Sequence, residues 1–277
     1  MPSRPNKIIV TCAAGAAAVL LAAGCGGGDM HQAAQALSAR QEITLAANQV
    51  KQINSFGSTL TVTMSGTVSG TIAGTMHIRT RPSRLADADF STFDIGSQSL
   101  PGGMHEIVTD RSIYLKMALL SQQLHKPWVK ISFSQLQQGT GINFSQLTQQ
   151  VQSNNPLVQT RMLAASKDAR AVGTQTIDGV STTHFTGSYP IAAGLAKLPA
   201  SERALAQKGV QTLGVKTVHF DVWIDGQHQT RKVVVTEAGS VETVKVAMQV
   251  TGINQPVSVT LPPASQVATI PASALQG

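Results

Sequence analysis

The sequence contains little cysteine, few aromatic side chains and little charge, and each scarcity excludes a class of protein. Only two of its 277 residues are cysteines, which excludes a small secreted fold stapled by several disulfides. Aromatic residues make up 4% of the chain, and the basic residues are scattered, with Arg231–Lys232 as the only adjacent pair. Nucleic-acid-binding proteins usually gather basic residues on one face. We therefore expect no nucleic-acid partner, despite a formal net charge of +7.

Motifs for catalysis and metal binding are also missing. No two of the seven histidines are three to five residues apart, the spacing of a zinc-binding pair on a helix. There is no G-x-S-x-G elbow and no phosphate-binding glycine loop. His184 and His219 lie on separate predicted strands that could bring them together, and Asp87 and Asp89 share one face of a strand. Structural or solvated side chains are the simpler interpretation of both pairs. We predict no catalytic residue, no metal site and no cofactor, hence a protein that is not an enzyme.

The first 25 residues have the organisation of an export signal. Arg4 and Lys7 precede an apolar, alanine-rich run over residues 8–23, which is short for a membrane-spanning helix. The segment Leu21-Ala22-Ala23-Gly24-Cys25 then resembles a bacterial lipobox, although Ala22 stands where leucine is commonest. In such signals, cleavage precedes the cysteine and its sulfur carries a diacylglyceryl group. The sequence thus predicts a signal peptide over residues 1–24 and a lipidated Cys25.

Lipidation at Cys25 has consequences for location and for the following segment. Two or more acyl chains, such as palmitate, hold a protein stably on a bilayer, whereas one chain does so only marginally. We therefore expect an exported protein anchored to the outer face of the cytoplasmic membrane. The glycine-, alanine- and glutamine-rich residues after the cysteine predict a flexible tether over residues 25–42.

Alternation of apolar and polar residues is the main structural signal in the rest of the chain. Leu60, Val62 and Met64 alternate with threonine and serine, as in a strand with one buried and one wet face. Residues 72–78 repeat the pattern after a glycine-containing turn, which predicts a hairpin. Further strands are predicted at residues 85–91, 104–109, 112–117 and 128–133.

The last third of the sequence predicts an antiparallel meander. Apolar residues alternate from Val218 to Ile224 and again from Val244 to Val250. Asp225–Gly226 predicts a turn after the first of these strands, and residues 228–237 predict the strand between them. Asp178–Gly179, between two other strand-like runs, is a strong hairpin signal.

Helical spacing appears loosely over residues 43–53 and more clearly between the two groups of strands. Residues 144–151 carry apolar side chains three and four apart, and Asn155–Pro156 predicts the start of a helix that continues through Leu163. A third helix is predicted at residues 201–213, after Pro199. The order of strands, helices and strands indicates an α+β fold built on an antiparallel sheet, without repeated βαβ units.

Four stretches together resemble an actinobacterial envelope lipoprotein. These are the lipobox and residues 126–131, 171–187 and 220–235. They are similar to the LppX and LprG lipoproteins and, more distantly, to the LolA and LolB carriers. The resemblance covers residues 43–262 and leaves 263–277 as a loose tail. It implies a curved antiparallel half-barrel sheet, with helices covering the concave face and an apolar cavity between them.

The leading hypothesis is therefore a membrane-anchored lipoprotein that binds a lipid or lipidated molecule, possibly for transport across the envelope. Helices near residues 144–165 and 201–213 would form a lid. Alternation alone cannot tell a cavity from a filled core. The alternatives are an envelope protein-interaction or sensory lipoprotein without a lipid cargo, and a hydrolase. Alternation selects nine candidate ligand-binding residues: Leu60, Val62, Met64, Val218, Phe220, Val222, Val244, Val246 and Met248.

Overall fold

The computed structural model describes residues 28–135, 156–200, 203–204, 206–207 and 213–270. Its strands are β1 (Ser55–Gly66), β2 (Gly70–Arg79), β3 (Leu85–Ile95), β4 (Gln98–Ser99), β5 (Met104–Thr109), β6 (Ser112–Met117), β7 (Trp128–Ser132), β8 (Arg170–Ile177), β9 (Val180–Pro190), β10 (Thr217–Asp225), β11 (Thr230–Ala238), β12 (Glu242–Thr251) and β13 (Val267–Thr269). Its helices are α1 (Gly28–Gln49), η1 (Val50–Gln52), α2 (Ala118–Leu124), α5 (Pro156–Leu163), α6 (Ile191–Leu195) and η2 (Ala264–Gln266).

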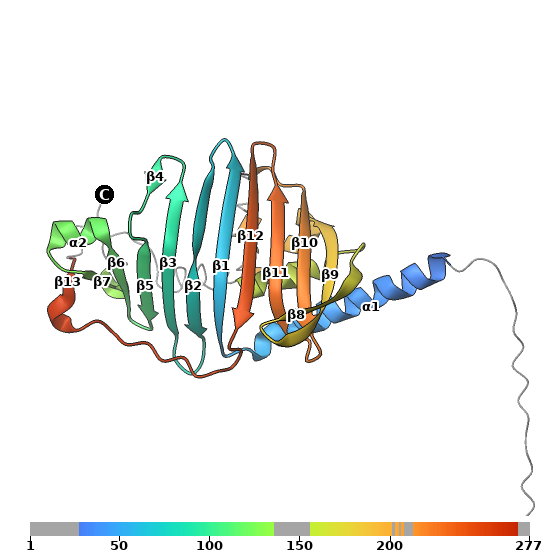
Figure 1. Ribbon diagram of the computed structural model, residues 1–277, viewed down its shortest axis with the longest axis horizontal. Helices are drawn as coiled ribbons and strands as arrows, with labels where there is room; N and C mark the ends of the chain where they lie inside the picture. The colour runs from blue at the N-terminus through green and yellow to red at the C-terminus, as the bar shows by residue number, and fades with distance from the viewer. Residues whose placement is uncertain (1–27, 136–155, 201–202, 205, 208–212, 271–277) are drawn as a thin grey trace, which may run out of the picture.

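The strands form one large, open and curved sheet (Figure 1). Their order is β13-β7-β6-β5-β3-β2-β1-β12-β11-β10-β9-β8, with β4 paired to β3. Pairing is antiparallel throughout, except between β13 and β7. Because β1 pairs with β12, the first and second groups of strands join side by side in the middle of the sheet. The predicted fold class, an α+β fold built on a curved antiparallel sheet, is confirmed.

Local sequence explains the strands and their turns. The alternation in β1 places its threonines on one face and Leu60, Val62 and Met64 on the other, which fits the period of two of a strand. Between β8 and β9, Asp178 and Gly179 both have positive φ angles, of 48° and 77°. Two such residues form the type I′ turn whose twist matches a tight hairpin. The predicted strands and both predicted hairpins are present.

The main core lies where helices cover one face of the sheet, which we call the inner face. Residues of α1 (Ile43), α5 (Leu163) and α6 (Leu195) pack with strands β9 to β12 and the start of β1 in one buried cluster. Figure 1 shows α1 and α5 behind these strands. The predicted helix from Pro156 to Leu163 is confirmed as α5.

The segment expected to be a flexible tether differs from that expectation. Helix α1 begins at Gly28, so residues 28–42 are helical rather than extended. Ala39 is only 1% exposed and belongs to the core, because its small side chain allows the helix to pack closely. The folded domain therefore starts before residue 43.

The C-terminal tail also differs from the expected loose segment. Residues 264–266 form η2, and β13 pairs in parallel with β7 through Val267–Trp128 and Thr269–Lys130. An edge strand presents unpaired backbone groups, and β13 satisfies those of β7. Residues 271–277 lie outside the described part of the chain.

Two predicted helices lie wholly or mostly outside the described residues. The helix predicted at residues 144–151 lies outside the described residues, and so does most of the helix predicted at 201–213. The proposed lid over the inner face therefore remains a prediction, apart from α5.

Candidate functional site

The nine candidate residues all lie at inner-face positions of three strands, β1, β10 and β12, in three rows across the sheet. Strand pairing joins Leu60 to Met248, Val62 to Val246, and Met64 to Val244. Strand β11 stands between β12 and β10, and its inner residues continue each row to β10. The rows are Leu60–Met248–Val233–Val222, Val62–Val246–Val235–Phe220 and Met64–Val244–Glu237–Val218.

Sequence reasoning missed the three residues that β11 contributes to these rows. Val233 and Val235 are buried, and Glu237 occupies the third position. The run Val233–Val234–Val235 is apolar at both faces, so it shows no alternation from which an inner face could be chosen. A signal was nevertheless available: the turn at Asp225–Gly226 fixes how β11 folds back on β10.

Burial divides the nine residues into two sets. Val218, Phe220, Val222 and Met248 are at most 2% exposed and belong to the packed core. The other five, all on β1 and β12, are half-buried, and of these Leu60 packs against the core. The row of Val62 continues on β2 and β3 through Ile72 and Phe93, which are also half-buried. We call this surface the half-buried strip: Val62, Met64, Ile72, Phe93, Val244 and Val246.

Two glutamates point toward the inner face among these apolar residues. Glu237 lies between Val218 and Val244, and Glu106 on β5 lies between Ala88 and Leu115. Burial raises the pKa of both carboxyl groups above the ordinary glutamate value. Each charge is thus held in a poorly solvated place.

Tyr189 lies close to Glu237 at the same end of the strip. It pairs with Val218, the residue that pairs with Glu237 on the other side, and only 2% of it is exposed. Burial, together with the nearby charge of Glu237, raises the pKa of the Tyr189 phenol. The phenol therefore stays protonated and can donate a hydrogen bond.

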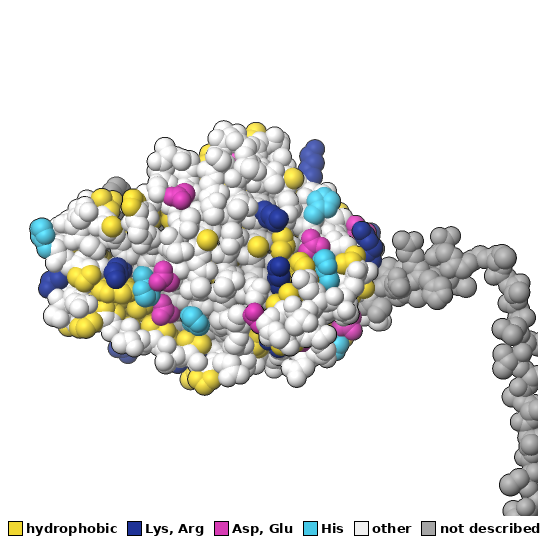
Figure 2. Space-filling model, in the orientation of Figure 1, with side chains coloured by type: hydrophobic (Ala, Val, Ile, Leu, Met, Phe, Trp, Pro, Cys, Tyr) yellow, Lys and Arg dark blue, Asp and Glu magenta, His cyan; other side chains and the backbone are white. Residues whose placement is uncertain are grey.

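Figure 2 shows the opposite, outer face, on which histidine and charged side chains are scattered. His184 stacks on Trp223 with ring centroids 4.2 Å apart, and its Nε2 lies 2.8 Å from an Asp221 oxygen. Lys232 Nζ lies 4.7 Å from the centroid of the Trp223 ring. His184 pairs with Trp223 across the strands whereas His219 pairs with Ser188, so the two histidines do not meet.

The other predicted pair, the carboxylates Asp87 and Asp89, differ in their contacts. His105 Nε2 lies 2.6 Å from an oxygen of Asp87, whereas Asp89 is exposed. Trp128 packs edge-on against His105. Asp87 and Asp89 share the outer face of β3, as predicted, but only Asp87 is paired with the histidine.

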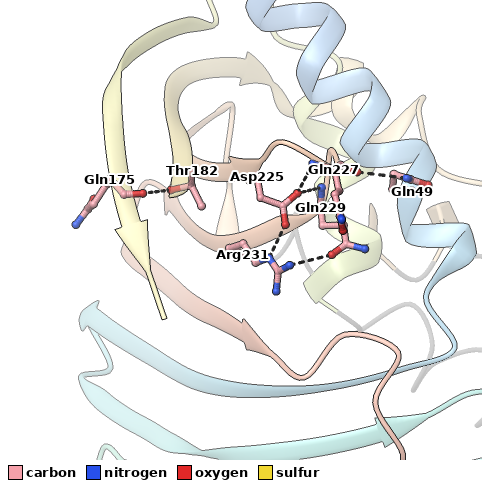
Figure 3. Close-up of polar contacts among 7 residues, drawn as sticks. All are labelled: Gln49, Gln175, Thr182, Asp225, Gln227, Gln229 and Arg231. Carbon is pink, nitrogen blue, oxygen red and sulfur yellow. Dashed lines mark hydrogen bonds and ion pairs between the residues drawn. The ribbon is translucent and has the colours of Figure 1, made fainter. Parts of the chain in front are cut away.

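A polar pocket of about 340 Å³ lies between α1 and the ends of β9 and β10. Its lining includes Glu42 and His228, whose Oε2 and Nδ1 lie 2.7 Å apart. Beside it, buried Asp225 accepts hydrogen bonds from the backbone of Gln227 and Gln229 and binds Arg231 at 2.6 Å (Figure 3). These contacts fix the β10–β11 turn and its junction with α1. The polar lining does not suit an acyl chain.

The described residues contain no group of three or more His, Cys, Asp or Glu side chains arranged to hold a metal ion. Among the helices of these same residues, none is long and apolar enough to cross a membrane.

Comparison with known proteins finds one curated relative and several similar structures. An uncharacterized 31.2 kDa protein of Streptomyces griseus, from the rplA–rplJ intergenic region, is 30% identical over 121 residues. That match covers 43% of this chain and 39% of the relative, so the chain spans well under half of that protein's length. No protein-family profile matches the chain.

Two solved mycobacterial structures are similar over most of the chain. The lipoprotein LppX of Mycobacterium tuberculosis is 18% identical, with a TM-score of 0.46, and the match covers 81% of this chain and 99% of LppX. LprF of Mycobacterium bovis is 13% identical, with a TM-score of 0.48, and the match covers 82% of this chain and 97% of LprF.

Proposed function

We propose that this protein is a lipid-anchored envelope protein that binds an acyl lipid, or the acyl chains of a lipidated molecule, on its inner face. The observation that carries the proposal is the half-buried strip. It continues the rows of a packed apolar core, yet its own valine, methionine, isoleucine and phenylalanine side chains keep accessible surface. Burying such surface against an acyl chain contributes about 0.8 kcal/mol for each methylene.

The packed core and the strip have different parts in this proposal. Val218, Phe220, Val222 and Met248 stabilise the wall, since their side chains are already enclosed by protein. Val62, Met64, Val244 and Val246 contact the ligand. A substitution at Val222 tests folding rather than binding, so the binding test belongs on the strip.

The experiment is native mass spectrometry of the mature chain, residues 25–277, with lipids extracted afterwards into organic solvent. A covalent anchor on Cys25 stays with the protein, so an extracted lipid is a bound ligand. We expect a discrete added mass in the wild type and its loss in Val62→Asp, and a weaker loss in the isosteric Val62→Thr.

The matched control is Thr61→Asp, the next residue on β1, which is exposed on the outer face. It adds the same charge to the same strand and should keep the bound lipid. A wild-type chain that carries no lipid and takes up none when offered would contradict the proposal, as would normal lipid uptake by a folded Val62→Asp chain.

Anchoring through Cys25 is tested separately. We expect the wild-type chain in the membrane fraction, with a diacylglyceryl mass on the peptide that begins at Cys25. In Cys25→Ser the mass should be absent. An unmodified Cys25 in a membrane-associated wild-type chain would overturn the anchoring proposal and leave ligand binding unaffected.

A second candidate function, docking of an envelope protein without lipid cargo, is favoured by strand β8. This strand ends the sheet, and seven of its eight residues are exposed. An open edge can accept a strand from another protein through backbone hydrogen bonds. Copurification of one stoichiometric protein, lost in Thr174→Pro and without bound lipid, would support this function over the first.

A further inference from the structure

The strands carry charge of only one sign on the inner face. Register places three charged residues of the described strands there, and all are glutamates: Glu106, Glu237 and Glu242. The lysines of the strands stand at outer positions, and the bulge residue Arg231 is bound to Asp225. Any ligand on the inner face therefore meets carboxylates and not strand lysines.

Glu237 and Tyr189 form a polar end to the half-buried strip. Glu237 is the direct neighbour of Val244 in the strip, and Tyr189 is reached across Val218. Within the described residues, neither the Glu237 carboxylate nor the Tyr189 hydroxyl makes a hydrogen bond. Glu242 is paired through one oxygen: its Oε2 accepts a hydrogen bond from the backbone of Val68 at 3.0 Å, whereas its buried Oε1 has no hydrogen-bond partner among the described residues.

A second buried polar group lies on the same face. Ser58 is 3% exposed, and in the part of the chain that the structure describes its Oγ has no hydrogen-bond partner. Ser58 pairs with Met76, and the same row continues through Ala88 to Glu106. Polar groups left unpaired in a poorly solvated place cost free energy, which a ligand with matching groups recovers.

We propose that Glu237 selects the ligand: an acyl lipid whose polar end is uncharged and bears hydroxyl groups, and not one that ends in a carboxylate or phosphate. This inference rests on the proposed lipid binding. A hydroxyl can donate to the Glu237 carboxylate. An anionic group at the same place would be repelled by Glu237, and weak solvation strengthens that repulsion. The raised pKa of Glu237 agrees with such a poorly solvated setting.

The test compares two lipids that share both acyl chains. The mature chain is offered equal amounts of dipalmitoylglycerol and dipalmitoyl phosphatidate in the same mixed micelles, and native mass spectrometry measures the ratio bound. We expect the wild type to favour dipalmitoylglycerol by about tenfold or more, and Glu237→Gln to reduce that preference to about threefold or less.

Asp89→Asn is the matched control, because it removes a carboxylate from the exposed outer face of the same sheet. It should leave the ratio at the wild-type value. Equal binding of the two lipids by the wild type, or an unchanged ratio in Glu237→Gln, would overturn the selection by Glu237 while leaving lipid binding intact. Failure of the wild type to take up either lipid would overturn the proposed function itself.

Discussion

Phe220 and Phe93 stand in one row of the sheet, but they are buried to different degrees. The row runs Phe220–Val235–Val246–Val62–Ile72–Phe93, from β10 to β3. Phe220 is 2% exposed beneath the helices, whereas Phe93 is half-buried. Both side chains occupy inner-face positions of antiparallel strands in the same sheet. The same alternation therefore yields a packed core at one end of the row and accessible apolar surface at the other, which is the property a lipid site requires.

The largest expected effect comes from the phenylalanines themselves. Phe220→Ala should lower the free energy of unfolding by about 3–5 kcal/mol, because it opens a cavity in an enclosed core. Phe93→Ala should cost about 1–2 kcal/mol, since part of its side chain already contacts solvent. Urea unfolding of both variants measures the difference. Equal losses would mean that the two ends of the row are packed alike.

Two inner-face methionines, Met248 and Met64, repeat the comparison at shorter range. Met248 is 1% exposed, and Met64 in the adjacent strand is half-buried. We expect Met248→Ala to cost about 2–5 kcal/mol and Met64→Ala about 1 kcal/mol. The order should reverse for bound lipid, where Met64→Ala has the larger effect on retention in native mass spectra. A Met64→Ala chain with full lipid retention would remove Met64 from the strip's contact surface.

The glutamates give a pH-dependent difference. Burial raises the pKa of Glu106 and Glu237 in the folded chain, so the folded state binds protons more tightly than the unfolded state. Stability due to these groups is fully present below the unfolded glutamate pKa and is lost as the pH rises through the folded value. Glu106→Gln and Glu237→Gln should therefore stabilise the protein at neutral pH, with a gain that fades on acidification. Melting temperatures across pH 4 to 8 measure this, and a gain that grows toward acid would contradict it.

The smallest effect is expected on the outer face. Asp87→Asn removes the partner of His105, and both side chains are partly exposed. Exposed ion pairs contribute about 0–1 kcal/mol, so the variant should unfold close to the wild type. A loss of more than about 2 kcal/mol in the free energy of unfolding, measured in urea, would contradict this. It would show that the cluster of Asp87, His105 and Trp128 stabilises the N-terminal half more than its exposure indicates.

Several features of this protein could be predicted from its sequence because they depend on local spacing. Alternating residues in β1, β10 and β12 identify which side chains share a face, since successive side chains of a strand point to opposite sides. Asp178–Gly179 identifies a turn because both residues adopt positive φ angles. Absence of β-strand alternation at Val233–Val235 likewise explains why the inner residues of β11 were missed.

Other features required the tertiary structure. The small residues before Ile43 indicated a tether, but a helix begins at Gly28, and its residue Ala39 packs into the hydrophobic core of the protein. The prolines near residue 263 indicated a loose tail, but β13 completes the edge at β7. In both cases the deciding partner lies far away in the sequence.

The sequence by itself determined the faces of the strands, the turns between them and the candidate lipid attachment at Cys25, because each depends on neighbouring residues. Only the tertiary structure decided that Val222 is enclosed while Val62 keeps accessible surface. It also decided that Glu237 and Tyr189 lie on either side of Val218 at the end of the strip. Burial depends on which distant helices and strands cover a face, and alternation carries no information about that cover.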